Sequence, residues 1–452
     1  MEELMELQAQ TIIDCITNRH LKELREIYEE YNIVDLALIT EELPLTSILF
    51  VFKVVSKSIS GQLFAYFTPE LQEKIIGAFS DDEIQAVLTN MYADDMVDFI
   101  SDMPANLVKK ILMSVSKEQR NKINILLSFP DYSAGSLMNT DYVELKENDR
   151  LEEALKKIKI RGRVAETISV CFVTDSAKQL IGSIRPEDIL FEESSEFIHE
   201  HMEEHIVSCN TFDDQEDVAK LFAKYDIDVL PVVNNDNCLI GIITSDDIID
   251  VMEAEVTEDI QKMAAIRPVE GSYLEASVFE MAKSRVPWLL ILMLSATFTG
   301  MILQNFEDKL LIIPALTAFV PMIMGSSGNA GNQSAVMVIR SMAINEITMK
   351  DFLKVLFKEL QIAVICGAAL FAVAMIRILI FPPHVTLEIA LIISATLFLS
   401  VVISKLLGAG LPFVSLVFKQ DPAATTTPVL TTIIDVVALL IYFQLCVIFL
   451  GL

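Results

Sequence analysis

The stretch GSSGNAGNQS (residues 325–334) interrupts a long apolar run, where a membrane-spanning helix would normally carry leucine and valine. Residues 310–339 contain no charge, and this length exceeds the roughly 20 helical residues that cross a hydrocarbon core. Small residues allow close helix packing, but packing does not account for the amides, which need polar partners in lipid. Irregular backbone is tolerated at this depth where it lines a cavity. The stretch therefore predicts a broken helix beside a polar pathway.

Further apolar runs flank this one and predict a bundle of five transmembrane helices in a lipid bilayer. The predicted spans are residues 287–306, 310–339, 360–381, 389–418 and 428–450. The loop after the second span carries Arg340, Lys350, Lys354 and Lys358, whereas the loop after the first holds only Glu307, Asp308 and Lys309. The positive-inside bias places the first half of the chain in the cytosol of a plasma-membrane protein and the C-terminus outside.

The charge of the chain lies almost entirely upstream of the spans. The formal net charge is −29, and residues 287–452 carry equal numbers of acidic and basic side chains, so the whole excess belongs to residues 1–286. So dense an acidic surface repels nucleic acid and attracts cations. The six cysteines form no C-x-x-C pair, and no signal peptide precedes the acidic start MEELMELQAQ. These features favour a reduced, cytosolic N-terminal half.

The first part of that half has the pattern of an all-α helical repeat. Amphipathic segments alternate with capping signals over residues 33–129. Ser80 with Glu83 and Ser116 with Gln119 fit the capping box, and Pro69 suits a first helical position. We expect an acidic α-helical domain over residues 1–131.

An internal repeat follows. LIGSIRPEDIL from Leu180 recurs as LIGIITSDDII from Leu239, and each copy reads as a helix, an apolar strand, a turn, a second strand and a closing helix. The copies resemble a tandem pair of α/β CBS domains, at residues 132–200 and 201–252. In that family a hydroxyl and an aspartate contact nucleotide, so the resemblance implies a possible ATP site at Asp188 and Thr244, although Arg185 stands where the first copy should carry its hydroxyl.

No enzyme signature is present. The sequence contains no H-E-x-x-H pair, cysteine cluster, Walker loop, nucleophile elbow or kinase motif. HEHMEEH at His199 resembles a metal-binding run, but its position on an exposed linker helix favours solvated side chains. We therefore expect transport rather than catalysis.

One carboxylate stands out in the membrane half. Asp435 is the only ionisable side chain between Asp421 and the C-terminus, and a carboxylate at bilayer depth costs at least ~2.5 kcal/mol. It either has a structural role, paired with Lys405 or hydrogen-bonded to its neighbours, or faces a water-filled pathway. The polar run TTTP upstream favours the pathway. One carboxylate beside oxygen donors suits a hard divalent cation that keeps its water, such as Mg²⁺, but leaves Mn²⁺ and Co²⁺ open.

Several motifs together resemble one known family. PMIMGSSGNAGNQSA, YSAGSLM from Tyr132, the CBS pair and EAEVTEDI from Glu253 follow in the order typical of the MgtE magnesium channels. The resemblance implies a homodimer whose second and fifth helices line a central pore, within a pore domain at residues 286–452. Asp435 would recognise the ion, and Gly325, Gly328, Asn332 and backbone carbonyls would border it. Residues 253–285 would form a connecting plug helix.

The family also implies regulatory Mg²⁺ ligands in the acidic half. Glu255, Glu258 and Asp259 share one helical face, where like charges repel until a divalent ion bridges them. Gln62 replaces an expected carboxylate, and Thr427 and Thr431 depart from the pattern beside the pore. The positions that match family ligands or extend the acidic run are Asp94, Asp214, Glu216, Ala223, Asp226, Asp246, Asp247, Asp250, Glu255, Glu258 and Asp259.

These features predict an Mg²⁺ channel that closes when cytosolic Mg²⁺ bridges the carboxylates and opens when they repel. Gating of this kind requires the ion to bind the closed state more tightly. Two alternatives stay open: a divalent cation exchanger driven by Na⁺ or H⁺, and a CBS nucleotide sensor whose spans only anchor and dimerise it.

Overall fold

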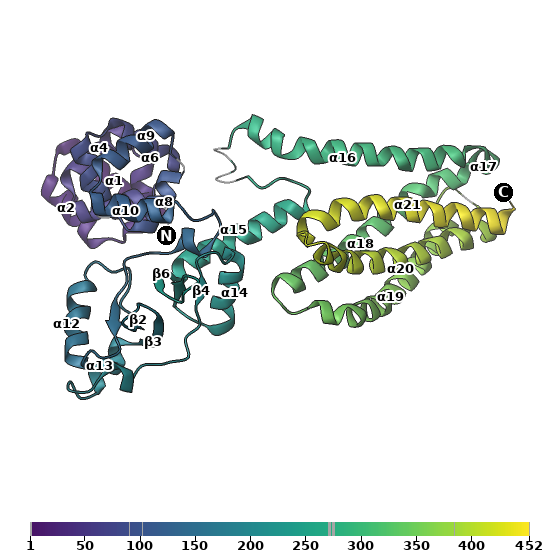
Figure 1. Cartoon of the computed structure of the whole chain (residues 1–452). Helices are drawn as coiled ribbons and strands as arrows, with labels where there is room; N and C mark the ends of the chain where they lie inside the picture. Colours follow the sequence, from purple (N-terminus) through teal and green to yellow (C-terminus); the bar gives the residue numbers. More distant parts are fainter. Residues whose placement is uncertain are drawn as a thin grey trace. The chain divides into compact units, whose positions relative to one another are not determined.

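The computed structural model describes residues 2–89, 91–101, 103–269, 273, 276–383 and 385–451. The chain forms two compact units, Met1–Met252 and Glu253–Leu452. The first contains a helical domain followed by two small sheets with their helices, and the second is a bundle of long helices (Figure 1). The predicted fold class, with its all-α, α/β and transmembrane α-helical parts, is confirmed.

Short helices packed around one apolar core make up the start of the first unit. The capping boxes at Ser80 and Ser116 are both formed, and Pro69 begins α6, as predicted. Phe64 is fully buried and lies edge-on to Phe52 and Phe99. The helices are α1 (Glu2–Asn18), α2 (Leu21–Glu30), α3 (Ile33–Glu41), α4 (Leu45–Val54), α5 (Lys57–Ala65), α6 (Pro69–Ala78), α7 (Asp81–Leu88), α8 (Ala93–Ser101), α9 (Ala105–Ser114) and α10 (Lys117–Leu126).

The internal repeat folds into two three-stranded sheets with the same topology. In each sheet the first strand pairs parallel to the second, and the second pairs antiparallel to the third. The first copy contains α11 (Ala134–Leu137), β1 (Glu144–Lys146), α12 (Leu151–Arg161), β2 (Cys171–Thr174), β3 (Leu180–Ile184), α13 (Pro186–Phe191) and the 3-10 turn η1 (Ile198–Glu200). The second contains β4 (Cys209–Asn210), α14 (Gln215–Tyr225), β5 (Val229–Val233), β6 (Leu239–Thr244) and α15 (Ser245–Met263). The sequence pattern did not reveal the short strands β1 and β4.

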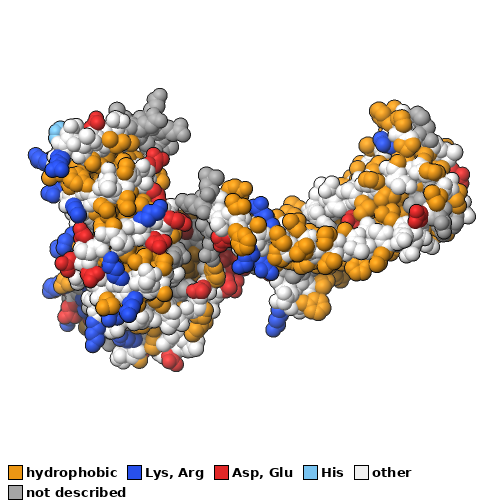
Figure 2. Space-filling view, turned by 90° about the horizontal axis from the view of Figure 1, so that it is seen from above, with side chains coloured by type: hydrophobic (Ala, Val, Ile, Leu, Met, Phe, Trp, Pro, Cys, Tyr) orange, Lys and Arg blue, Asp and Glu red, His pale blue; other side chains and the backbone are white. Residues whose placement is uncertain are grey.

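Five helices of 24 residues or more form the second unit, with shorter pieces between them. Four of them are long and apolar enough to cross a membrane, by length and composition: α16, α19, α20 and α21. Hydrophobic side chains cover much of the visible surface of this unit, whereas charged ones gather on the other (Figure 2). The elements are α16 (Val278–Asn305), α17 (Glu307–Ile312), η2 (Pro314–Phe319), α18 (Val320–Ala343), η3 (Met349–Asp351), α19 (Phe352–Ile380), α20 (Leu387–Val417) and α21 (Pro422–Leu450).

The predicted break in the second span is wrong. Residues 325–334 lie inside α18, which is one α-helix from Val320 to Ala343, so their carbonyls belong to a regular helix. In lipid an unbroken helix satisfies its own backbone, and each glycine costs only about 1 kcal/mol. The start of this span was also misplaced, because residues 310–319 form the end of α17 and η2, where Pro314 cannot donate a helical hydrogen bond.

α18 nevertheless differs from its neighbours. Its 24 residues extend about 36 Å, enough for a bilayer, but its glycines and amides keep it outside the set of four apolar helices.

Pro287 and Pro412 both lie within continuous helices, α16 and α20. The expected linker helix around His199 is only the short turn η1.

Candidate functional site

Helix α18 makes a backbone contact with α20 in the middle of the glycine-rich stretch. A methyl group at Gly408 would lie 2.2 Å from the carbonyl oxygen of Gly331, and one at Gly331 would lie 2.2 Å from Cδ1 of Ile434 on α21. Gly331 therefore lets three helices meet. By contrast, a methyl group at Gly325 or Gly328 would meet nothing within 4 Å. Packing inside the chain thus explains one of these three glycines and leaves the other two unexplained.

Oxygen atoms of α18 and α21 are buried without hydrogen-bond partners among the described residues. They include Oδ1 of Asn332 and the hydroxyls of Ser327, Thr426 and Thr427. An unpaired buried polar atom costs about 1–3 kcal/mol, so such atoms point to an additional ligand or water. Asn332 follows Gly331, and half-buried Asp435 follows Ile434, which packs against Gly331. The structure thus places Asn332 and Asp435 beside one helix contact, and the other unpaired oxygens of α18 and α21 lie in the two polar runs, GSSGNAGNQS and TTTP, that the sequence had marked.

Lys405 does not neutralise Asp435. Its side chain is 4% exposed and its Nζ donates to Oγ of Ser334 at 3.3 Å. The Ser334 hydroxyl in turn donates to Oε2 of Glu359 at 2.7 Å. This network joins α18, α19 and α20, so the alternative that paired Lys405 with Asp435 is not what the structure shows.

In the first unit, carboxylates from the helical domain and from both CBS copies face one another. The pKa of Asp95 is raised to about 6. The largest cause is desolvation by the surrounding protein, and the negative charges of Asp247 and Asp246 add to it, although part of the Asp95 side chain remains exposed to solvent. Burial and then the charges of Asp247, Asp95, Asp246 and Asp141 raise the pKa of Glu166 to about 8. Burial also raises the pKa of Asp247. Burial is the largest cause of these shifts and the neighbouring negative charges add to it, so a cation near the group would favour the ionised carboxylates.

The sequence had singled out neither Asp95 nor Glu166. Asp94, the predicted ligand, precedes Asp95 on α8, and its side chain lies outside the part of the chain that the structure describes. Glu166 lies in a loop of the first CBS copy, and its Oε2 accepts from Asn139 Nδ2 at 2.7 Å. No local sequence pattern marks it, because tertiary contacts bring it to the other carboxylates.

The other predicted ligands of the second CBS copy lie at the ends of α14 and the start of α15. Asp214 caps α14 and accepts from the backbone of Glu216, whose carboxylate pairs with Lys220 at 3.0 Å. Ala223 lies in the last turn of α14, and Asp226 is its left-handed cap at φ 52°. Asp250 is exposed on α15. These positions have structural roles in capping and ion pairing as well as the proposed ligand roles.

The predicted plug residues belong to α15, where Asp246 and Asp247 occupy the first turn. Glu255, Glu258 and Asp259 are half-buried, and Oε1 of Glu258 already pairs with Lys262 Nζ at 2.8 Å. The same ammonium pairs with Oδ2 of Asp421 at 2.8 Å. Burial opposes the charge, but hydrogen bonds to Asp421 and Glu258 outweigh it and raise the pKa of Lys262. Lys262 therefore ties the end of α15 to the start of α21.

The adjacent Met263 extends this contact with apolar packing. It lies against a buried cluster of α18 and α21 that includes Ala335, Leu430 and Ile434. The end of α15 thus packs on α18 and α21, the helices that carry Asn332 and Thr426.

The candidate nucleotide residues are arranged differently in the two copies. In the second, Oγ1 of buried Thr244 donates to Oδ2 of Asp247 at 2.6 Å. In the first, Arg185 pairs with Glu187 at 3.5 Å, and the backbone of Asp188 bonds to the Arg185 carbonyl. The hydroxyl of the motif is thus replaced by an ion-paired arginine.

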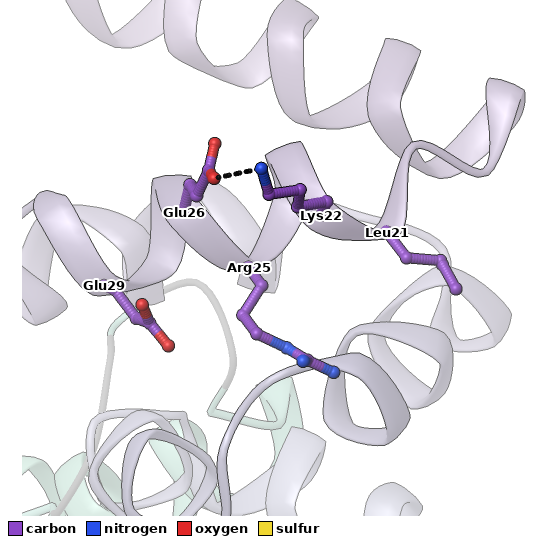
Figure 3. Close-up of a pocket in the computed structure, with 5 residues that line it drawn as sticks. All are labelled: Leu21, Lys22, Arg25, Glu26 and Glu29. Atoms are coloured by element: carbon purple, nitrogen blue, oxygen red, sulfur yellow. Dashed lines mark ion pairs between the residues drawn. The ribbon is translucent and has the colours of Figure 1, made fainter.

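A pocket of about 490 Å³ on the helical domain contains none of the predicted site residues. It is lined by residues of α2 (Figure 3), where Lys22 pairs with Glu26 at 3.6 Å. Arg25 Nε donates to the carbonyl of Val54 at 3.0 Å. Both basic side chains are thus engaged by the protein itself.

A bundle of long apolar helices with a half-buried carboxylate, on the same chain as two CBS domains, indicates the class of membrane transport proteins. Residues 320–445 match the family model for MgtE divalent cation transporters, residues 31–132 match that for the MgtE intracellular N domain, and residues 134–195 and 197–254 each match a CBS domain. The chain belongs to the MgtE family.

Its relatives match over nearly the whole chain. The magnesium transporter MgtE of Thermus thermophilus is 31% identical, covering 98% of both chains, and that of Bacillus subtilis is 28% identical, covering 97% of this chain and 96% of its own. The crystal structure of the soluble part of a magnesium transporter matches with a TM-score of 0.54 at 28% identity, over 56% of this chain and 99% of that one. The cytosolic domain of the Mg²⁺ channel MgtE in complex with ATP matches with a TM-score of 0.51 at 28% identity, over 54% and 99%.

Proposed function

We propose that this membrane protein is an Mg²⁺ channel that closes when Mg²⁺ binds its acidic half. The gating proposal rests on one observation. Asp95, Asp247 and Glu166 lie close enough for their charges to interact, and the pKa of each is raised. A divalent cation removes this repulsion, and it favours whichever conformation brings the carboxylates together. Mg²⁺ binding therefore stabilises the compact arrangement, and unbound carboxylates favour separation.

The pore part of the proposal rests on oxygen donors of α18 and α21. Asp435 supplies one carboxylate, while Asn332, Ser327 and Thr426 offer buried oxygens without partners among the described residues. Mg²⁺ dehydrates reluctantly and is typically bound through water with one or two carboxylates. We assign recognition of hydrated Mg²⁺ to Asp435 and these side chains; the carbonyls of α18, being helical, would not be the main ligands.

A homodimer would complete this pathway. In that assembly the second and fifth helices of each subunit, α18 and α21, line the pore. A methyl group added at Gly325 or Gly328 would meet nothing within 4 Å in the single chain, which leaves room for a second subunit or the ion. With the acidic half in the cytosol and five spans, the C-terminus lies outside the plasma membrane.

The gate would run through α15. When Mg²⁺ holds the acidic half compact, Lys262 and Met263 keep the end of α15 on α18 and α21 and block the pathway. Further regulatory ions would bind the remaining carboxylates named above, with Asp94, Asp214, Glu216, Asp226 and Asp250 among them and the carbonyl of Ala223 as a backbone ligand. Because Glu258 is paired with Lys262, it must exchange that partner to bind an ion.

ATP binding at the CBS pair would add a second input. The related cytosolic domain was crystallised with ATP. Here the bonded pair Thr244 and Asp247 and the aspartate Asp188 occupy the motif positions for nucleotide. Asp247 would then serve both the acidic cluster and the nucleotide, which would couple the two ligands.

The test is a flux assay in proteoliposomes loaded with a fluorescent Mg²⁺ indicator. Wild-type protein should admit Mg²⁺ without a Na⁺ or H⁺ gradient, faster than Mn²⁺, Co²⁺ or Ca²⁺, and Asp435→Asn should reduce the rate at least tenfold. Flux that requires a Na⁺ or proton gradient would show a coupled exchanger. Absence of any ion flux would favour the anchored nucleotide sensor.

A further inference from the structure

The first CBS copy contains a group of metal-binding side chains away from the acidic cluster. Glu192, Glu196 and His201 offer ligand atoms that all lie within 4.8 Å of one another. Nε2 of His201 is 2.7 Å from Oε2 of Glu196. Among the residues that the structure describes, no other group of three histidine, cysteine or carboxylate side chains meets this spacing.

The backbone fixes this group in place. Glu192 is the residue after α13, and the amide of Leu151 at the start of α12 donates to the carbonyl of Glu196 at 2.9 Å. Ile198 is fully buried, and the amide of His201 donates to its carbonyl at 3.0 Å. The His201 side chain is only 21% exposed. The ligands thus come from a segment that is anchored to the core at two points.

The composition of the group selects a kind of ion. Mg²⁺ prefers an all-oxygen shell, whereas imidazole with carboxylates suits Zn²⁺ and its neighbours in the first transition row. Tetrahedral zinc ligands at 2.0–2.2 Å stand roughly 3.3 Å apart, so small side-chain rotations would close the present spacing. Two carboxylates and a neutral imidazole would balance the charge of a divalent ion, and water would fill the fourth position.

A simple ion pair between His201 and Glu196 does not involve Glu192. Yet Glu192 brings a second carboxylate oxygen within 4.8 Å of the ligand atoms of both. We propose that Glu192, Glu196 and His201 bind a divalent transition-metal ion of the zinc class. The ion ties the end of α13 to the turn η1, and none of its ligands belongs to the group of Asp95, Asp247 and Glu166.

The test uses the full chain in detergent, stripped of metal with EDTA and then equilibrated with Zn²⁺ in millimolar Mg²⁺, which occupies the oxygen-only sites. A chromophoric zinc chelator competes for the metal. Wild-type protein should hold one Zn²⁺ per chain against the chelator, and His201→Gln and Glu196→Gln should weaken that binding by roughly 10- to 100-fold or more. Glu192→Gln, at an exposed position, should weaken it without any effect on folding.

Neighbouring residues supply matched controls. His199→Gln and Glu193→Gln lie in the same segment but outside the group, and both should retain wild-type Zn²⁺ affinity. Equal losses in His199→Gln and His201→Gln, or a wild type that binds no more Zn²⁺ than His201→Gln, would overturn the proposal. Bound Co²⁺ should also give the visible absorption of a four-coordinate site, and a six-coordinate spectrum would contradict the ligand set. None of these outcomes depends on whether the protein conducts Mg²⁺.

Discussion

The backbones of Gly331 and Gly408 are so close that a side chain at position 408 has no room. A methyl group there would lie 2.2 Å from the carbonyl oxygen of Gly331. Helices α18 and α20 therefore touch through their backbones, and α18 stays helical through its glycines. The close contact also holds Ser334, one turn further along α18, within reach of Lys405. A single crossing thus explains both the glycine at 408 and the buried lysine.

We expect Gly408→Ala to push α18 and α20 apart and to destabilise the membrane unit by about 1–3 kcal/mol, as overpacking does. Thermal unfolding in detergent measures the loss. Gly300→Ala is the matched control, because a methyl group on α16 at that position meets nothing within 4 Å and helix propensity improves by up to about 1 kcal/mol. Equal melting temperatures for the two variants would contradict the backbone contact.

Much of this architecture could be predicted from local signals. The capping boxes at Ser80 and Ser116 and the repeated LIG motifs depend on neighbours in the sequence, so they located helices and sheets correctly. The break predicted at residues 325–334 failed for the opposite reason. Whether glycine bends a helix or packs it depends on the partner helix, and Gly408 lies far away in the sequence.

The same distinction separates the site residues that were predicted from those that were missed. Asp435 stands out locally because it is charged within an apolar run. Asp95 and Glu166 are ordinary acids in an acidic half, and only the folded structure brings them near Asp247. The pairing of Lys262 with Asp421 was also hidden, since 159 positions separate two common residues.

In the network of Lys405, Ser334 and Glu359, changing one charged residue should destabilise the protein more than half as much as changing both. Lys405→Met removes a donor to Ser334, and Glu359→Gln replaces the charged acceptor with a neutral one, so each change alone should cost about 1–3 kcal/mol. The double variant removes both charges and should be more stable than the sum of the single losses predicts. Thermal unfolding of the four proteins in detergent forms the cycle, and strict additivity would show that the two side chains do not interact.

Lys262→Met should loosen the proposed gate. Each half-exposed ion pair contributes about 0.2–1 kcal/mol, so losing the contacts to both Asp421 and Glu258 should raise the Mg²⁺ concentration for half closure by roughly twofold to 30-fold. Flux in proteoliposomes at a series of Mg²⁺ concentrations measures this shift. Lys262→Arg keeps the charge and should lie close to wild type. An unchanged closing concentration in Lys262→Met would show that these pairs do not hold the gate.

The acidic cluster should make stability depend on pH. The pKa values of Asp95 and Glu166 are about 6 and about 8 in the folded protein, above their unfolded values of 3.8 and 4.5. The folded state therefore binds more protons between pH 4 and 8, and its stability must fall as pH rises through this window. In EDTA, lowering the pH from 8 to 5.5 should raise the melting temperature by roughly 2–4 °C for each kcal/mol of repulsion removed.

Mg²⁺ should abolish much of the pH dependence of stability, because bound Mg²⁺ and bound protons relieve the same repulsion between carboxylates. Glu166→Gln should also flatten it, since the neutral side chain keeps its place beside Asn139 without a charge to repel Asp247. Glu193→Gln removes an exposed acid elsewhere in the same CBS copy and should leave the slope as in wild type. Circular dichroism melts of the full chain in detergent provide the measurement. A slope that Mg²⁺ does not change would mean that the cluster is not a cation site, because bound Mg²⁺ must compete with protons for these carboxylates.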